Sequence, residues 1–377
     1  MKKNNFLYKA LFSVAAILFA TSAIAIPKDP CAPKDVCCDE ATPGPFAFAY
    51  PKDNGLSCPR GFNVYGEFLW MKPSEEGLEY AISNHTTAAN PWIFPILVGK
   101  VESFSSGSQE WDWRPGFRIG FGSNSTFDKY QIEASWTYIK IKATANATIN
   151  GAGDFLPLFL PAIVPQGGVT FSLKDASTKW SGDFNSFDIS CSKPYHVSRY
   201  YVSSPRFGVR TAWIDQDMVY RYSLISEFST DLSARAIAKN DYWGVGLLGA
   251  YNSQFIISKN WNIYAKALVS LLFGKFDISQ HANWTTIGSA PTAHSYDVED
   301  SFYSVQPNAE LGVGLCWTRT FDHDQYLASV KVGYEFHHWW NQNQIRRFFD
   351  TDPTANDTVS RGDLSFNGFE FAVNIDF

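Results

Sequence analysis

After its first 25 residues the sequence has no apolar run of the roughly 18–20 residues that a membrane-spanning helix requires. It also has no excess of basic residues. Its 31 Lys and Arg stand against 37 Asp and Glu, so we expect no nucleic-acid partner. It contains no Gly-x-Ser-x-Gly elbow, no phosphate loop and no His-Glu-x-x-His sequence. We therefore expect no enzymatic activity and no cofactor.

Histidine and acidic residues are not spaced as metal ligands. His337 and His338 are adjacent, and neighbours on a strand point to opposite faces, so they would not share a metal. The sequences Asp-His-Asp at 322–324 and Asp-Thr-Asp at 350–352 lack the Gly and distal Glu of a calcium loop and predict turns instead. We expect no bound metal.

The first 25 residues have the pattern of a secretory signal peptide. A basic start is followed by an apolar stretch from residue 10 to 20 and by Ala23-Ile24-Ala25, a small-x-small cleavage site. The apolar stretch is too short for a transmembrane anchor, so we expect cleavage after Ala25. The mature chain then has 28 basic and 37 acidic side chains and a net charge of −9.

Residues 26–60 form a separate zone that is rich in proline and cysteine. Its seven prolines exclude regular structure, and we expect an irregular periplasmic tail. Disulfides persist in that oxidising compartment, and at least one is expected between chains. Zinc is the weaker alternative, because two of the cysteines are adjacent and no His lies at finger spacing. The disulfide candidates are Cys31, Cys37, Cys38 and Cys58, whereas Cys191 and Cys316 are not expected to pair.

The last ten residues sort into an apolar and a polar set by alternation. A period of two places successive side chains on opposite faces of a strand, so this strand has one face suited to hydrocarbon. The edge of a soluble β-sandwich would give the same pattern. Aromatic residues make up 16% of the chain, however, and a final Phe is typical of the closing strand of outer-membrane barrels, which the assembly machinery reads. The proposed assembly signal is Phe369, Phe371, Val373, Ile375 and Phe377.

The same alternation recurs along the chain and predicts about ten strands within residues 61–377. Short turns near 123–127, 193–199, 258–260 and 319–325 alternate with loops of about 20–40 residues. This asymmetry favours an all-β, transmembrane antiparallel β-barrel with short periplasmic turns and long extracellular loops. An additional hairpin of residues 78–82 with 98–104 would raise the count, so we expect an even total from ten to fourteen.

The polar parity of the predicted strands carries charged residues that would face the lumen. They could line a charged constriction that filters solutes. They could instead pair into salt bridges that fill a narrow barrel. The first interpretation predicts a pore and the second a surface or adhesive protein whose barrel is only an anchor. The candidates are Glu67, Arg118, Glu133, Asp188, Arg206, Arg210, Lys266, Glu310, Lys331, Glu335 and Glu370.

Several segments in their order resemble a known family. They include Cys-Ala-Pro-Lys-Asp-Val-Cys-Cys at 31–38, Tyr-Gly-Glu-Phe-Leu-Trp-Met-Lys at 65–72, Trp-Arg-Pro-Gly-Phe-Arg-Ile-Gly at 113–120 and Gly-Val-Arg-Thr-Ala-Trp-Ile-Asp at 208–215. They are similar to the major-outer-membrane-protein-like porins of Legionella and chlamydia-related bacteria. The resemblance implies a multi-pass, pore-forming outer-membrane barrel that is often cross-linked by disulfides. The polar and charged inward positions add the expectation of passive diffusion of small hydrophilic solutes. We expect contact with outer-membrane lipid and a homo-oligomer or disulfide-linked neighbours.

Overall fold

The computed structural model describes residues 50–51, 56, 61–84, 99–104, 111–124, 130–149, 154–159, 172–225, 232–286, 292–348, 357–359 and 361–377. Among them, no helix is long and apolar enough to cross a membrane. The predicted signal peptide lies outside the described residues. So do Cys31, Cys37, Cys38 and Cys58 of the tail.

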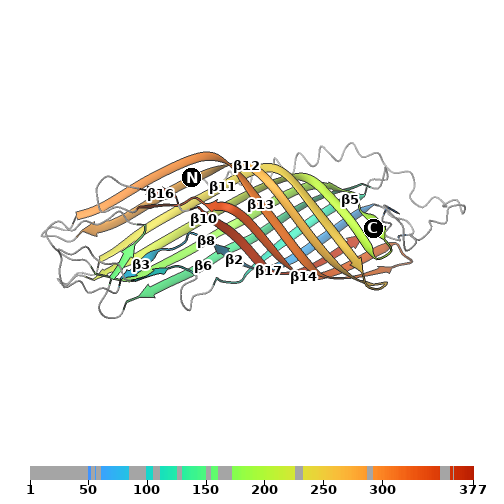
Figure 1. The fold of residues 1–377 in the computed structure, drawn as a ribbon, viewed down its shortest axis with the longest axis horizontal. Coiled ribbons are helices and arrows are strands. Elements are labelled where there is room, and N and C mark those ends of the chain that lie inside the picture. The colour runs from blue at the N-terminus through green and yellow to red at the C-terminus, as the bar shows by residue number, and fades with distance from the viewer. Residues whose placement is uncertain are drawn as a thin grey trace, which may run out of the picture.

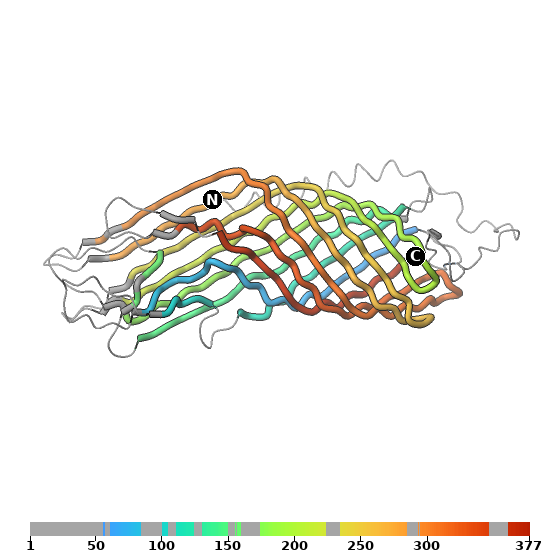
Figure 2. The backbone as a smooth tube through the Cα atoms, in the orientation of Figure 1, coloured from blue at the N-terminus to red at the C-terminus, as the bar shows by residue number. Residues whose placement is uncertain are grey.

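Ten antiparallel strands close into one barrel (Figures 1 and 2). Each strand pairs with its neighbours in the order β10-β11-β12-β13-β14-β17-β2-β5-β6-β8, and β8 pairs back to β10. The prediction of an antiparallel barrel with an even total of ten to fourteen strands is thereby confirmed, and the total is ten. The strands are β2 (Phe62–Glu75), β5 (Arg114–Asn124), β6 (Gln131–Thr148), β8 (Ser172–Ser192), β10 (Tyr201–Ile225), β11 (Leu232–Ile256), β12 (Trp261–Thr286), β13 (Thr292–Phe321), β14 (Tyr326–Asn343) and β17 (Gly362–Asp376).

The pairing of the first and last barrel strands closes the ring. Phe62 and Phe377 exchange backbone hydrogen bonds, with N···O distances of 3.1 and 2.9 Å. Phe369, Phe371, Val373 and Ile375 lie on the outer face of β17, each at least 38% exposed. The terminal segment is therefore the strand that closes the barrel, and its outer face is apolar. The proposed assembly signal requires such an apolar closing strand.

The additional hairpin forms but does not join the barrel wall. β3 (Ala81–Asn84) pairs with β4 (Gly99–Glu102) and with β7 (Asp154–Pro157) in a separate three-stranded sheet. Two smaller pairings join β15 (Arg346–Phe348) to β16 (Asp357–Val359), and β1 (Tyr50–Pro51) to β9 (Tyr195–Ser198), which also pairs with β10. The short strands β3, β4, β7, β15 and β16 pair with one another and not with the barrel strands. The barrel therefore has ten strands.

The barrel wall is uneven in height. β5 has 11 residues whereas β13 has 30, and a tilted strand needs only about 9–11 residues to cross a membrane. β10–β13 therefore extend well beyond the bilayer, at the end opposite the C-terminus (Figure 1). At the C-terminal end the described turn between β13 and β14 is tight. Asp322, His323 and Asp324 in it all have φ between 52° and 61°.

Apolar side chains cover the outside of the wall on alternate positions of each strand. Leu247 and Phe207 are 75% and 71% exposed, a degree of exposure that only contact with lipid makes favourable. On β13 the apolar outer positions run from Tyr303 to Trp317, and beyond Tyr303 they give way to Ser301 and Glu299. The apolar residues that the period-two pattern assigns to the lipid side therefore lie on the outer face of the barrel.

The loop-side half of the lumen is filled by a hydrophobic core. The Phe159 ring, next to β7, stacks on Tyr220 of β10 with centroids 3.8 Å apart. Trp111 stacks on Phe104 and meets the inward Trp180 edge-on, with centroids 4.9 and 5.2 Å apart. These contacts hold loop segments inside the tall part of the barrel.

Candidate functional site

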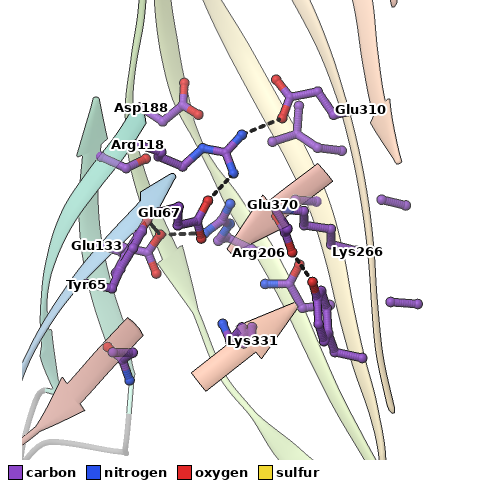
Figure 3. A pocket seen from close by; sticks show the side chains of 18 of the residues that line it. Tyr65, Glu67, Arg118, Glu133, Asp188, Arg206, Lys266, Glu310, Lys331 and Glu370 are labelled. Carbon is purple, nitrogen blue, oxygen red and sulfur yellow. Dashed lines mark hydrogen bonds and ion pairs between the residues drawn. The ribbon is translucent and has the colours of Figure 1, made fainter. Parts of the chain in front are cut away.

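Below this core, toward the short turns, charged side chains form a layer across the lumen. Nine of the ten barrel strands contribute the eleven candidates from the sequence, and β11 contributes none. The close-up shows most of them converging from the surrounding wall (Figure 3). We call these eleven residues the charged layer: Glu67, Arg118, Glu133, Asp188, Arg206, Arg210, Lys266, Glu310, Lys331, Glu335 and Glu370.

Arg210 makes the most completely buried contacts of the layer. Its Nε and Nη2 each lie 2.7 Å from an oxygen of Asp188, its partner across the β8–β10 pair. Its Nη1 lies 2.6 Å from Glu310 Oε1 and 2.9 Å from Asn308 Oδ1, both on β13. A planar guanidinium suits such two-point contacts. Arg210 therefore ties two separate parts of the wall together.

Arg118 makes the corresponding link on the other side. Its Nη1 lies 2.5 Å from Glu67 Oε2 and 3.0 Å from Glu335 Oε1. Its Nη2 is 3.8 Å from Glu310, which joins Arg118 to the Arg210 cluster. Arg118, Arg210 and the carboxylates that they contact thus form one continuous network across the lumen, in which basic and acidic side chains alternate.

Lys266 continues this network toward the barrel seam. Its Nζ forms ion pairs with Glu335 and, at 2.6 Å, with Glu370 Oε2. The other oxygen of this carboxylate, Glu370 Oε1, accepts a hydrogen bond from the Tyr264 hydroxyl. The Tyr264 ring needs space that glycine provides, because a Cβ on Gly333 would lie 2.1 Å from its hydroxyl oxygen. Glycines on the inner face therefore make room for large polar side chains.

Two basic residues of the layer lie nearer the short turns. Arg206 Nη1 is 2.7 Å from Glu133 Oε1, which also accepts a hydrogen bond of 2.8 Å from the Tyr65 hydroxyl. Lys331 lies over the Tyr264 ring, 5.8 Å from its centroid, and within the described residues it has no carboxylate at ion-pair distance. Lys331 is thus the basic group most available to a solute.

A cavity of about 170 Å³ lies among these side chains and extends toward the short-turn end. That volume holds several water molecules. Its wall includes Lys331, Arg206 and Glu133, together with Asn63 and Asn374 near the ends of their strands. The cavity can therefore hydrate the charged layer on the side of the short turns.

On the opposite side an aromatic layer crosses the lumen. Phe184 contacts Trp339 edge-on and Phe366 at a tilt, with centroids 5.3 and 5.0 Å apart. All three are fully buried, and each lies four residues along its strand from a member of the charged layer. In the conformation described here this aromatic layer separates the cavity from the loop end.

Carboxylates within the charged layer are the nearest approach to a metal site. Oxygens of Glu67, Glu335 and Glu370 lie within 4.8 Å of one another. Arg118 and Lys266 already form ion pairs with these oxygens, so protein cations supply the positive charge that a metal ion would bring. The donor set fits an ammonium and a guanidinium better than a metal ion.

The structure adds residues that the sequence patterns did not single out. Phe184, Trp339 and Phe366 fall on the inward parity, but apolar character was assigned to the lipid side. Their inward position could have been read from parity alone, since each is an even number of residues from a charged-layer member. Cys191 is exposed on β8 and Cys316 is buried on β13, and in the part of the chain that the structure describes the two are not paired with each other.

No curated protein sequence matches the chain. Among solved structures it is similar to the outer membrane protease OmpT of Escherichia coli, at 8% identity and TM-score 0.35 over 85% of this chain and 97% of that one. It is also similar to the CymD monoaromatic hydrocarbon channel, at 9% identity and TM-score 0.32 over 90% and 98%.

The sequence itself matches a family model. The match is to the Legionella pneumophila major outer membrane protein precursor and covers residues 57–377, which include every strand of the barrel. The predicted resemblance is confirmed over most of the chain, together with its implication of a multi-pass outer-membrane location. The chain belongs to the Legionella pneumophila major outer membrane protein family.

Proposed function

We propose that the protein is a channel for passive diffusion of small hydrophilic solutes, with the charged layer as its constriction. The observation that carries this proposal is the charged layer itself, to which nine of ten strands contribute. Replacing a buried ion network by apolar side chains is often neutral or stabilising, so a lumen packed only for stability does not need one. A cavity on one side of the network, large enough for several water molecules, supports the same proposal.

The charge balance of the layer favours cations slightly. It holds six acidic and five basic side chains, and the mature chain as a whole is acidic. Rings of acidic side chains select cations in other pores. No bound cofactor and no energy source are part of this proposal.

The aromatic layer makes the described conformation a closed one. Passage requires Trp339 and its two neighbours to move, together with the loop segments held in the core above them. This same feature favours the second candidate function, in which the barrel is a closed anchor for surface loops.

Solute uptake separates the two functions. Liposomes that contain the purified folded protein should take up small sugars and amino acids faster than protein-free liposomes, with a low size limit. Uptake at the protein-free rate, by protein whose circular dichroism shows a folded barrel, would favour the anchor.

Ion selectivity tests the role of the charged layer separately. Lys331→Glu should shift the reversal potential toward cations, because it reverses the basic charge most available to solutes. Lys193→Glu, outside the layer beside Tyr130 at the turn end, is the matched control and should shift it less.

A further inference from the structure

On the outer face of the barrel, above the apolar band, three polar side chains form a hydrogen-bonded chain. Ser365 Oγ lies 2.8 Å from His338 Nδ1, and His338 Nε2 lies 3.2 Å from Asp363 Oδ2. Ser365 and His338 are direct cross-strand partners on β17 and β14. A hydroxyl, an imidazole and a carboxylate in this sequence of contacts are the groups that activate a serine nucleophile.

The carboxylate of this chain is fixed by the backbone. Asp363 Oδ1 accepts a hydrogen bond of 2.7 Å from the backbone N–H of Asn341. Asn341 has a φ of 52°, and the register of β14 against β17 shifts between Trp339 and Asn343. Such irregularities cost free energy and commonly re-aim groups next to active sites. Here the irregularity supplies an N–H that holds Asp363 toward the imidazole.

The imidazole is held as well. The His338 ring stacks along Phe336 and meets Trp340 edge-on, with centroids 5.8 and 4.7 Å away. A carboxylate at Nε2 favours the tautomer that carries its proton there. The lone pair of Nδ1 then faces the Ser365 hydroxyl, which is the arrangement a general base requires.

A large cavity adjoins the nucleophile. It measures about 1090 Å³, and Ser365 and Asp363 form part of its wall together with Lys72 of β2. Lys72 is diagonal to Ser365 across the β17–β2 pair, a spacing that long side chains bridge. Its ammonium would stabilise negative charge that develops on a carbonyl oxygen. The apolar part of the cavity consists of Leu78, Ile82, Val101, Phe104, Trp111 and Leu158.

The position in the membrane indicates the kind of substrate. On β14 the outer-face residues adjoining His338 are Phe336 and Trp340, about 40% and 38% exposed, and aromatic residues of this kind mark the membrane interface. A cavity with an apolar interior and a polar wall at this level suits an amphipathic molecule. Its acyl chain would lie against Phe104 and Trp111, and its ester group beside Ser365.

We propose that Ser365 is the nucleophile of an ester-hydrolysing site that accepts acyl esters from the lipid surface. Ser365 Oγ attacks the ester carbonyl carbon and its proton passes to His338 Nδ1. The bond to the alcohol oxygen then breaks, and the alcohol leaves with that proton. Water, activated by the same imidazole, releases the fatty acid and restores Ser365. His338 is the general base and Asp363 is a positioning residue.

The three side chains of the site are separate from the charged layer. They lie on the outward parity of β14 and β17, whereas the charged layer lies on the inward parity. A substitution of Ser365 therefore leaves the contacts of the charged layer in place. No local sequence motif marks the site, because its members come from two strands that meet only through the barrel register.

An alkyl fluorophosphonate probe tests the nucleophile directly. The full-length folded protein in detergent micelles should be labelled on Ser365, as located by peptide mass spectrometry. Ser365→Ala should abolish labelling. Ser74→Ala should leave labelling unchanged. Ser74 is the cross-strand partner of Ser365 on β2 and lies in the same cavity wall, but it is not part of the Ser365–His338–Asp363 hydrogen-bonded chain.

Hydrolysis of 4-nitrophenyl octanoate tests the other two residues. His338→Asn should lower kcat by about 10²–10⁴-fold. Asp363→Asn should lower kcat more than it changes KM, and Asp363→Glu should recover part of the loss, a pattern that a purely structural carboxylate would not give. Circular dichroism confirms folding of each variant. An unlabelled folded wild type, or labelling of Ser365→Ala at the wild-type rate, would overturn the proposal.

Discussion

Arg210 and Asp188 face each other across the β8–β10 pair and form a two-point ion pair inside the barrel, with both N···O distances at 2.7 Å. The arginine side chain is only 2% exposed, and its third nitrogen is used by Glu310. Charges removed from water to this extent are stable only when their partners are present.

Truncation of Arg210 should therefore destabilise the barrel strongly. Arg210→Ala leaves Asp188 and Glu310 without their shared cation and should lower the free energy of unfolding by about 3–5 kcal/mol. Urea titration in lipid vesicles measures it. Arg206→Ala is the matched control, because Arg206 and Glu133 are more exposed, and its loss should be smaller. Equal losses would show that burial of the network does not set its importance.

Substitution of an inner-face glycine by alanine should destabilise the barrel where a tyrosine ring packs over that glycine. A Cβ on Gly120 would lie 2.3 Å from the Tyr65 ring, which its hydrogen bond to Glu133 holds in place. Gly120→Ala should cost about 1–3 kcal/mol in unfolding free energy. Gly66, on the outer face with nothing within 4 Å of its Cβ position, provides the comparison. Gly66→Ala should be neutral or slightly stabilising, and the reverse order of the two would refute this account of the glycines.

The apolar band should reject charge at its middle and accept it beyond its edge. Leu311 is 56% exposed and lies midway between Tyr303 and Trp317 on the outer face of β13. Leu311→Arg should cost about 2–4 kcal/mol if that point is the bilayer midplane. Ser301→Arg, on the same face beyond Tyr303 and beside Asp277, should cost little. Similar costs at both positions would place the bilayer elsewhere.

The stability of the loop-side rim should depend on pH through Glu75. Glu75 lies beyond the last apolar outer position of β2, Trp70, and is outside the lipid-facing band. Burial raises the pKa of its carboxyl to about 8, although the Gln216 side chain donates a hydrogen bond to it. In the unfolded chain the carboxyl ionises near 4.5. The unfolded state therefore loses this proton first as pH rises.

Stability should consequently fall between about pH 4.5 and pH 8 and level off above the folded pKa. Glu75→Gln removes the ionisation and should flatten this part of the profile. The other ionisable residues of the same cavity wall, Lys72, Glu76, Glu79, Arg361 and Asp363, remain in both proteins. An unchanged slope in Glu75→Gln would assign the pH dependence to them.

Alternation along the chain predicted the barrel because lipid and lumen impose opposite requirements on successive residues. Val313, for example, is exposed on the outer face, whereas its neighbour Gly312 lies on the inner face against the Lys266 side chain. Strand ends were harder to predict. β13 continues to Thr292, some eleven residues before the regular alternation of Tyr303–Trp317, because its upper part pairs with β12 above the membrane, where the outer face is polar.

The inward orientation of the charged residues followed from the same parity, but their partners did not. Arg118 contacts Glu335 although 217 residues separate them, and only the order of strands around the ring brings them together. The aromatic layer was missed for a related reason. An inward Trp339 beside an outward Trp340 gives two adjacent tryptophans, and hydrophobicity alone assigns neither to a face.

A channel requires that ions pass through the lumen. Single-channel recording in planar bilayers should show discrete steps for the wild-type protein. The steps should be larger for Trp339→Ala, which removes the largest side chain of the aromatic layer. Trp340→Ala removes the same side chain from the outer face and should leave their size unchanged. The absence of steps from folded protein in all three would contradict the proposed channel and leave the barrel as an anchor.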